Sequence, residues 1–215
     1  MNFDKQVKNY FDDPELSVDT KYYGSIETKT NDKYSDVDVE VTPTNTKEFY
    51  LNFLKHLESI NSYYVIFPVV INENPQVFTI VWKNQSLYKK LDLRINAEPD
   101  LELVKNSYDF DEKLRPFYNL YIGALRFIKY RKRKELIASM KFYRSAHEYL
   151  IRIDPKPKLL HKYFFLKDKQ YIDIYFIAIL KKYLKISISS KLIEKNSIHD
   201  EFARDVIKFA QNELL

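Results

Sequence analysis

The sequence predicts an α+β fold in which residues 1–112 are rich in strands and residues 113–215 form a helical bundle. In the first part, apolar residues alternate with polar ones, as in half-buried strands. In the second they recur every three or four residues, as in amphipathic helices. The charge changes sign at the same place: residues 1–112 hold 12 Lys/Arg and 20 Asp/Glu, and residues 113–195 hold 21 and 6. Together these changes indicate two domains.

The composition agrees with a folded protein of 215 residues, of which 45% are hydrophobic and 16% aromatic. There is no cysteine, which excludes disulfides, thiolate zinc sites and a cysteine nucleophile. The start, MNFDKQVKNYFDD, lacks the apolar core of a secretory signal, and the strongest apolar run, Ile174–Leu180, is too short to cross a bilayer. We therefore expect a cytoplasmic protein without a membrane segment.

The elements of the first domain follow from spacing and turn residues. Apolar residues at helical spacing predict a short helix over residues 3–11, which ends before Asp12-Asp13-Pro14. Thr46 can cap a helix from Lys47 to about Asn61. Strands are expected at residues 18–24, 36–42, 63–71, 77–83 and 87–95. The last three are separated by turn residues, which predicts a meander.

The second domain is predicted to be helical throughout. Apolar residues at helical spacing begin at Leu114, run past Arg131 and continue to about Ile153, where Asp154-Pro155-Lys156-Pro157 breaks the pattern. Further helices are expected at residues 157–166, 169–186 and 198–214, the last with Ser197 as its cap. Such a set of helices is typical of a bundle.

The stretch that carries chemistry runs from Lys21 to Val41, KYYGSIETKTNDKYSDVDVEV. Asp36 and Asp38 share one face of a strand, because successive side chains of a strand point to opposite faces. Two carboxylates so close together need a cation or hydrogen-bond donors between them, and for a cation held by oxygen ligands magnesium is favoured. Gly24 lets the backbone approach a phosphate closely, and Ser25 can donate a hydrogen bond to it.

In type and spacing, Gly24, Ser25, Asp36 and Asp38 resemble the signature of the nucleotidyltransferase superfamily of the DNA polymerase β type. The resemblance covers roughly the first half of the chain and implies a mixed-sheet catalytic domain. It also implies a third carboxylate on a later strand, for which Asp92 in LYKKLDLRI is the best candidate. In layout the chain looks most similar to small antibiotic nucleotidyltransferases, which add a helical domain.

The resemblance further implies a reaction. A nucleoside triphosphate would bind with its phosphates against Gly24 and Ser25. Asp36, Asp38 and Asp92 would be the catalytic, metal-binding residues, with two magnesium ions, and Asp92 could instead be the general base. The acceptor hydroxyl would belong to a small molecule such as an antibiotic. The alternative is a catalytically silent module of the same fold that binds RNA or a partner protein through its basic helices.

Several of these residues also have an interpretation without chemistry. A bare Asp-x-Asp is more often a solvated edge strand, but the Gly-Ser pair and the loop length favour a site here. Asp92 shares a face with Arg94, and the two could form a surface ion pair; for Arg94 we favour that interpretation. Asp109, Asp111 and Glu112 are rival general bases, although acids at helix starts are common.

The basic run Lys129–Lys134, KYRKRK, could hold an RNA backbone, but a solvated helix face is the more common explanation. The four histidines lack the spacing of metal ligands. We therefore expect packed or surface histidines.

Overall fold

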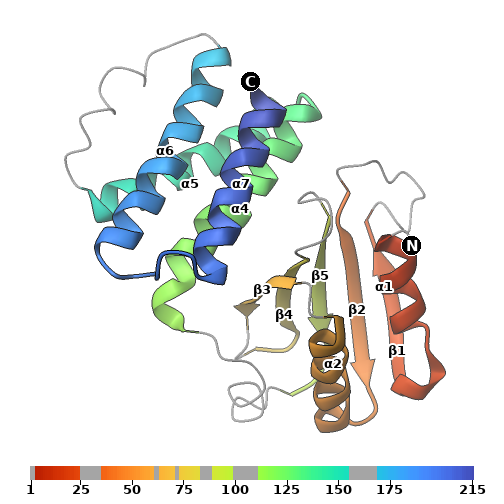
Figure 1. Ribbon diagram of the computed structural model, residues 1–215. Coiled ribbons are helices and arrows are strands. Elements are labelled where there is room, and N and C mark those ends of the chain that lie inside the picture. Colours follow the sequence, from red (N-terminus) through yellow and green to blue (C-terminus); the bar gives the residue numbers. More distant parts are fainter. Residues whose placement is uncertain are drawn as a thin grey trace. The chain divides into compact units, whose positions relative to one another are not determined.

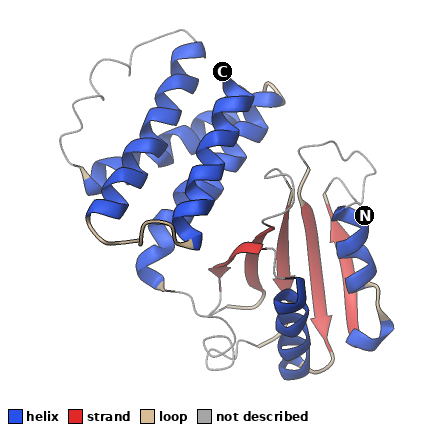
Figure 2. Cartoon of the chain, in the orientation of Figure 1, coloured by secondary structure: helices blue, strands red, loops and turns tan. Residues whose placement is uncertain are grey.

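The computed structural model describes residues 3–24, 35–60, 63–70, 73–82, 89–98, 111–154 and 169–215. The chain divides into two compact units, Met1–Phe110 and Asp111–Leu215. The first unit holds all the described strands and the second is helical, which confirms the predicted α+β class (Figures 1 and 2). Ser25, Asp109 and the helix predicted over residues 157–166 lie outside the described residues.

The elements of the first unit agree with the predicted ones to within a few residues. In chain order they are α1 (Phe3–Phe11), the short 3-10 helix η1 (Pro14–Leu16), β1 (Val18–Tyr23), β2 (Val37–Pro43), α2 (Thr46–Ile60), β3 (Tyr63–Val70), β4 (Gln76–Trp82) and β5 (Lys90–Ile95).

These strands form one mixed sheet in the order β1-β2-β5-β4-β3. β3, β4 and β5 pair antiparallel in sequence order, so the predicted meander is confirmed. β2 pairs antiparallel with β1 and parallel with β5. The two strands that carry the predicted acids are therefore direct neighbours near the middle of the sheet (Figure 1).

The core of the first unit lies where α1 and α2 pack against one face of the sheet (Figure 1). Alternation along β2 sends its three valines to this face, all of them at most 1% exposed, and leaves Asp38 and Glu40 partly exposed on the other. The core comprises mainly Val7, Phe11, Val37, Val39, Val41, Phe49, Tyr50, Phe53, Phe78, Ile80, Trp82, Leu91, Leu93 and Ile95. Burial of the apolar side thus fixes which way the acids point.

The second unit contains the short 3-10 helix η2 (Glu112–Leu114), α4 (Arg115–Lys132), α5 (Leu136–Ile153), α6 (Lys169–Ser189) and α7 (Ile198–Leu214). The helical pattern that we expected to continue from Leu114 to Ile153 is interrupted. Lys134 has φ +63°, and the chain turns there so that α4 and α5 pack on each other. A left-handed residue cannot continue a right-handed helix.

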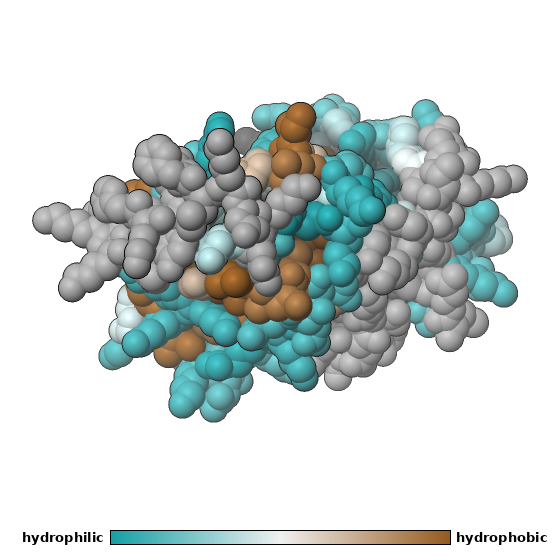
Figure 3. Space-filling model, turned by 90° about the horizontal axis from the view of Figure 1, so that it is seen from above, coloured by the Kyte–Doolittle hydropathy of each residue, from teal (hydrophilic) through white to brown (hydrophobic). Residues whose placement is uncertain are grey.

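Aromatic side chains fill the core of the helical unit. Phe127 of α4 and Phe176 of α6 stack with ring centroids 3.9 Å apart, and Tyr121 donates a hydrogen bond to the Leu180 carbonyl. Hydrophilic residues cover much of the described surface, and hydrophobic ones reach it in places, Ile137 most completely at 91% exposed (Figure 3). Among the described helices, none is both long and apolar enough to cross a membrane.

Candidate active site

Three of the predicted acids lie on one face of the sheet, opposite α1 and α2. The parallel register of β2 and β5 places Asp38 beside Asp92, and in-register residues of paired strands point to the same face. Asp36 lies just before β2 and shares the parity of Asp38. It contacts Lys90, which shares the parity of Asp92, so all three carboxylates are on this face.

Gly24 lies at the end of β1, directly against Asp38. Its φ is +67°, a conformation that favours glycine, and a Cβ at this position would lie 3.1 Å from Asp38 Oδ2. Tyr23, the preceding residue, is the register partner of Asp38. The turn and the carboxylate beside it therefore both favour glycine at this position. Ser25, predicted to bind phosphate with it, is outside the described residues.

Lys90 is one residue of this face that the sequence patterns did not single out. Its ammonium nitrogen lies 3.1 Å from Asp36 Oδ2 and donates a short hydrogen bond to Asp92 Oδ2. The Lys90 side chain is only 2% exposed, and those of Asp36 and Asp92 are 10% and 20% exposed. A buried ammonium between Asp36 and Asp92 compensates the repulsion between these two carboxylates.

Asp92 is held on its other oxygen as well. Thr79 of β4 is its register partner and donates a hydrogen bond of 2.5 Å to Asp92 Oδ1. Thr79 is 1% exposed, so this hydroxyl is buried. Asp92 is thus oriented by a cation on one oxygen and by a neutral donor on the other, which fixes its rotamer.

Arg94 lies beside the Tyr23 ring of β1. It is exposed, and its guanidinium carbon lies 5.7 Å from the centroid of the Tyr23 ring. This is the range of a cation–π contact. Arg94 therefore lies at the edge of the acidic face, toward β1.

The donor set fits a hard cation held by a few protein oxygens. Magnesium is commonly bound by one or two carboxylates and completes its shell with water and substrate phosphates. Asp36 and Asp38 can serve in this way. No group of three or more His, Asp or Glu side chains that could hold a metal ion is found among the described residues. Lys90 contacts both Asp36 and Asp92. The geometry fits a shared protein–phosphate site better than a closed protein cage.

Two of the rival bases have structural partners at the start of the helical unit. Asp111 caps η2 by accepting a hydrogen bond of 2.9 Å from the Lys113 amide. Glu112 pairs with Arg115 at 2.6 Å, and the hydrogen bond from that guanidinium lowers the pKa of Glu112. Both contacts are those of acids at a helix start.

The basic run Lys129–Lys134 is partly used in helix packing. Arg131 binds Asp173 of α6 through two hydrogen bonds of 2.7 and 2.5 Å, and Lys132 pairs with Glu213 of α7 at 3.2 Å. Two cations of this run are therefore engaged in intramolecular ion pairs. This weakens the interpretation of the run as a dedicated RNA-binding surface.

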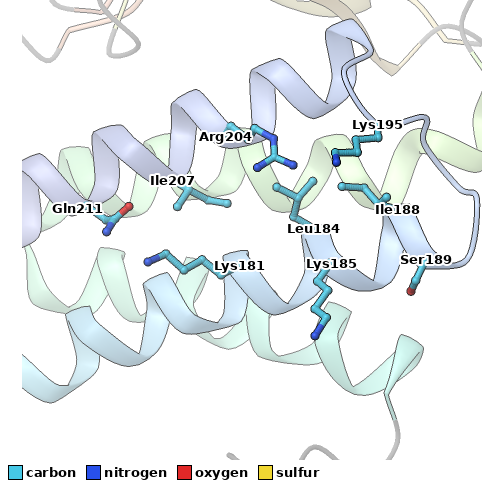
Figure 4. A pocket seen from close by; sticks show the side chains of 9 residues that line it. All are labelled: Lys181, Leu184, Lys185, Ile188, Ser189, Lys195, Arg204, Ile207 and Gln211. Carbon is cyan, nitrogen blue, oxygen red and sulfur yellow. The ribbon is translucent and has the colours of Figure 1, made fainter.

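A second group of cations surrounds a groove of about 700 Å³ between α6 and α7 (Figure 4). Leu184 and Ile207 form its buried floor, at 5% and 6% exposed. The exposed cations around it are Lys181, Lys185, Lys195 and Arg204. Arg204 pairs with Asp200 at 2.7 Å, whereas no carboxylate of the described residues pairs with the three lysines. The groove is therefore an electropositive surface.

No protein-family model matches the sequence, and no curated protein matches it at a significant level. Solved structures that are similar to it include the following two. One is Cid1, described with an RNA terminal uridylyl transferase activity: 14% identity, TM-score 0.30, 61% of this chain and 42% of the Cid1 chain covered. The other is the GLD-2/RNP-8 complex: 12% identity, TM-score 0.32, 86% of this chain and 80% of that chain covered. The chain thus spans less than half of the Cid1 chain. These likenesses identify neither an activity nor a substrate of this chain.

Proposed function

We propose that the chain is a metal-dependent nucleotidyltransferase, which moves a nucleoside monophosphate from a nucleoside triphosphate to an acceptor hydroxyl. The observation that carries this proposal is the meeting of Asp36, Asp38 and Asp92 on one face, with Gly24 against Asp38. Acidic side chains beside a left-handed glycine can hold a cation and a polyphosphate together.

The chemistry assigned to the site is an in-line displacement. The acceptor hydroxyl attacks the α-phosphorus, the bond from that phosphorus to the bridging oxygen breaks, and pyrophosphate leaves. Asp36 and Asp38 would hold magnesium, which supplies charge neutralisation at the transferred phosphoryl group. Gly24 and Ser25 would approach the phosphates. Asp92, which Thr79 and Lys90 orient, would either complete a two-metal site or accept the hydroxyl proton.

As acceptor we propose a small hydroxyl compound such as an antibiotic. Residues 113–195, with 21 Lys/Arg against 6 Asp/Glu, disfavour a cationic aminoglycoside, because like charges repel. A neutral acceptor of the lincosamide type suits the chain better.

The test is transfer of label from α-³²P nucleoside triphosphates to pooled hydroxyl compounds, RNA and lysate protein, with magnesium or with EDTA. We expect labelled product with magnesium only, and at least a ~100-fold lower rate for Asp38→Ala. Asp19→Ala is the matched control, because Asp19 is an exposed aspartate at the other end of the neighbouring strand β1. Equal labelling by folded Asp38→Ala would refute the proposed site.

The groove between α6 and α7 favours a second candidate, an RNA-binding module without catalysis. Lys181, Lys185 and Lys195 could follow a phosphate backbone. Fluorescence anisotropy with single-stranded RNA should then show an RNA affinity that falls steeply with salt and does not change when a nucleoside triphosphate is added. Lys181→Glu/Lys185→Glu should weaken it, whereas Lys208→Glu, an exposed lysine of α7 that does not line the groove, should have a smaller effect. RNA binding that depends on the added nucleotide would favour the enzyme instead.

A further inference from the structure

Lys90 contacts both Asp36 and Asp92, the two carboxylates that a second metal ion of the proposed site would share. We infer that Lys90 is a built-in cation of this site: it takes the place of one of two metals, so that a single divalent ion binds on the Asp36–Asp38 side. This inference rests on the proposed function and deepens it, because it assigns Lys90 a positioning role and sets the number of metal ions.

The contacts of Asp92 support this assignment. Lys90 donates to its Oδ2 and Thr79 donates to its Oδ1, so each oxygen already faces a donor. A magnesium ligand must lie at about 2.0–2.1 Å from the ion in octahedral geometry. An ammonium and a magnesium ion cannot both occupy the space beside Asp92 Oδ2, since two cations so close together repel each other strongly.

The burial of Lys90 supports it as well. A lysine that is 2% exposed is stable as a cation only if negative groups compensate the loss of hydration. Asp36, just before β2, and Asp92, on the neighbouring strand β5, provide two such negative groups. The same pair would repel each other if the ammonium were removed, and a divalent ion would then be the natural replacement.

The inference is tested with manganese, a substitute for magnesium, on the full chain. In EDTA, Lys90→Met should unfold at a lower temperature than the wild type. Manganese chloride should raise the midpoint of Lys90→Met by about twice the rise in the wild type or more, because a metal now fills the position of the ammonium. Lys90→Arg retains the charge and should respond like the wild type. Adding Asp92→Asn to Lys90→Met should remove the additional rise.

Metal stoichiometry decides the question if Lys90→Met does not fold. Titration of the wild-type protein with manganese in the presence of ATP, followed by the electron paramagnetic resonance of unbound manganese, should give one ion per chain. Two ions per chain, or the same manganese-induced rise in Lys90→Met and wild type, would overturn the inference. If the manganese results are as expected for wild type and variants but no nucleotide is transferred, the proposed function is overturned, whereas Lys90 keeps its role as a cation between Asp36 and Asp92.

Discussion

At the scale of single residues, Gly24 joins the backbone of β1 to the acidic face. We expect Gly24→Ala to destabilise the protein by about 1–2 kcal/mol, because φ is +67° and the new Cβ would lie 3.1 Å from Asp38 Oδ2. It should also weaken metal binding, since Asp38 must move. Urea unfolding and manganese titration measure the two effects.

Gly123→Ala is the matched control. Gly123 lies inside α4, and a Cβ there would meet the Phe142 ring at 3.7 Å, an ordinary contact. This substitution should stabilise the protein by about 0.5–1 kcal/mol, as alanine does in a helix. A Gly24→Ala protein as stable as wild type would show that the turn is not constrained as described.

Sequence patterns pointed to some residues of the acidic face and missed Lys90. Alternation placed Asp36 and Asp38 on one face of their strand, because strand parity is a local property, whereas Asp92 was joined to them only through the family resemblance. Parity also put Lys90 on the face of Asp92, but a lysine beside a strand aspartate is usually solvated. Only the parallel pairing of β2 with β5, between residues more than 50 positions apart, brings Lys90 to Asp36 and buries it.

At the scale of elements, the ion pair between Arg131 and Asp173 connects α4 to α6. Both side chains are nearly buried, at 12% and 10% exposed, and two hydrogen bonds join them. Asp173→Asn should therefore lower the free energy of unfolding by about 3 kcal/mol, because the nearly buried Arg131 guanidinium then lacks the Asp173 carboxylate. Urea unfolding monitored by circular dichroism measures this loss.

Glu112→Gln is the comparison for that prediction. Glu112 also pairs with an arginine, Arg115, but it is 62% exposed, so its loss should cost less than about 1 kcal/mol. Equal costs for Asp173→Asn and Glu112→Gln would contradict the claim that Arg131 and Asp173 hold α4 to α6.

His199 gives the contact of α4 with α7 a dependence on pH. Its Nδ1 lies 2.5 Å from the Tyr118 hydroxyl, and burial lowers the pKa of His199 below its ordinary value of 6.5. The unfolded chain therefore binds the proton more readily, and stability should fall as the pH drops below about 6.5. Urea unfolding at about pH 7.5 and about pH 5.5 should show this loss, reduced in His199→Gln. An identical loss of stability between the two pH values in both proteins would exclude His199 as the source of that loss.

Helix ends show why the element pattern was only partly predictable. The break between α4 and α5 lies at Lys134, whose φ is +63°. Glycine or asparagine usually marks such a position, and a lysine gives no such signal. The contact of α5 with α4 overrides that local preference. Where a helix boundary has a local cause, the predicted boundary is confirmed. Ser197, which caps the start of α7, is an example.

At the scale of the whole molecule, the change in charge and period along the sequence corresponds to two separately packed units. The helical unit has its own aromatic core, so we expect residues 111–215 expressed alone to fold cooperatively. Circular dichroism during urea unfolding should show high helicity and one sigmoidal transition. A gradual loss of signal would mean that the helices depend on the first unit.

In the first unit, the acidic face is proposed to bind a nucleotide together with a metal ion. The most direct measurement is the thermal unfolding midpoint with ATP or GTP, with and without magnesium, in the wild type and in Asp38→Ala. We expect a rise in the wild type only when nucleotide and magnesium are both present, and none in Asp38→Ala. The same rise in both proteins, or no rise in the wild type, would contradict the account.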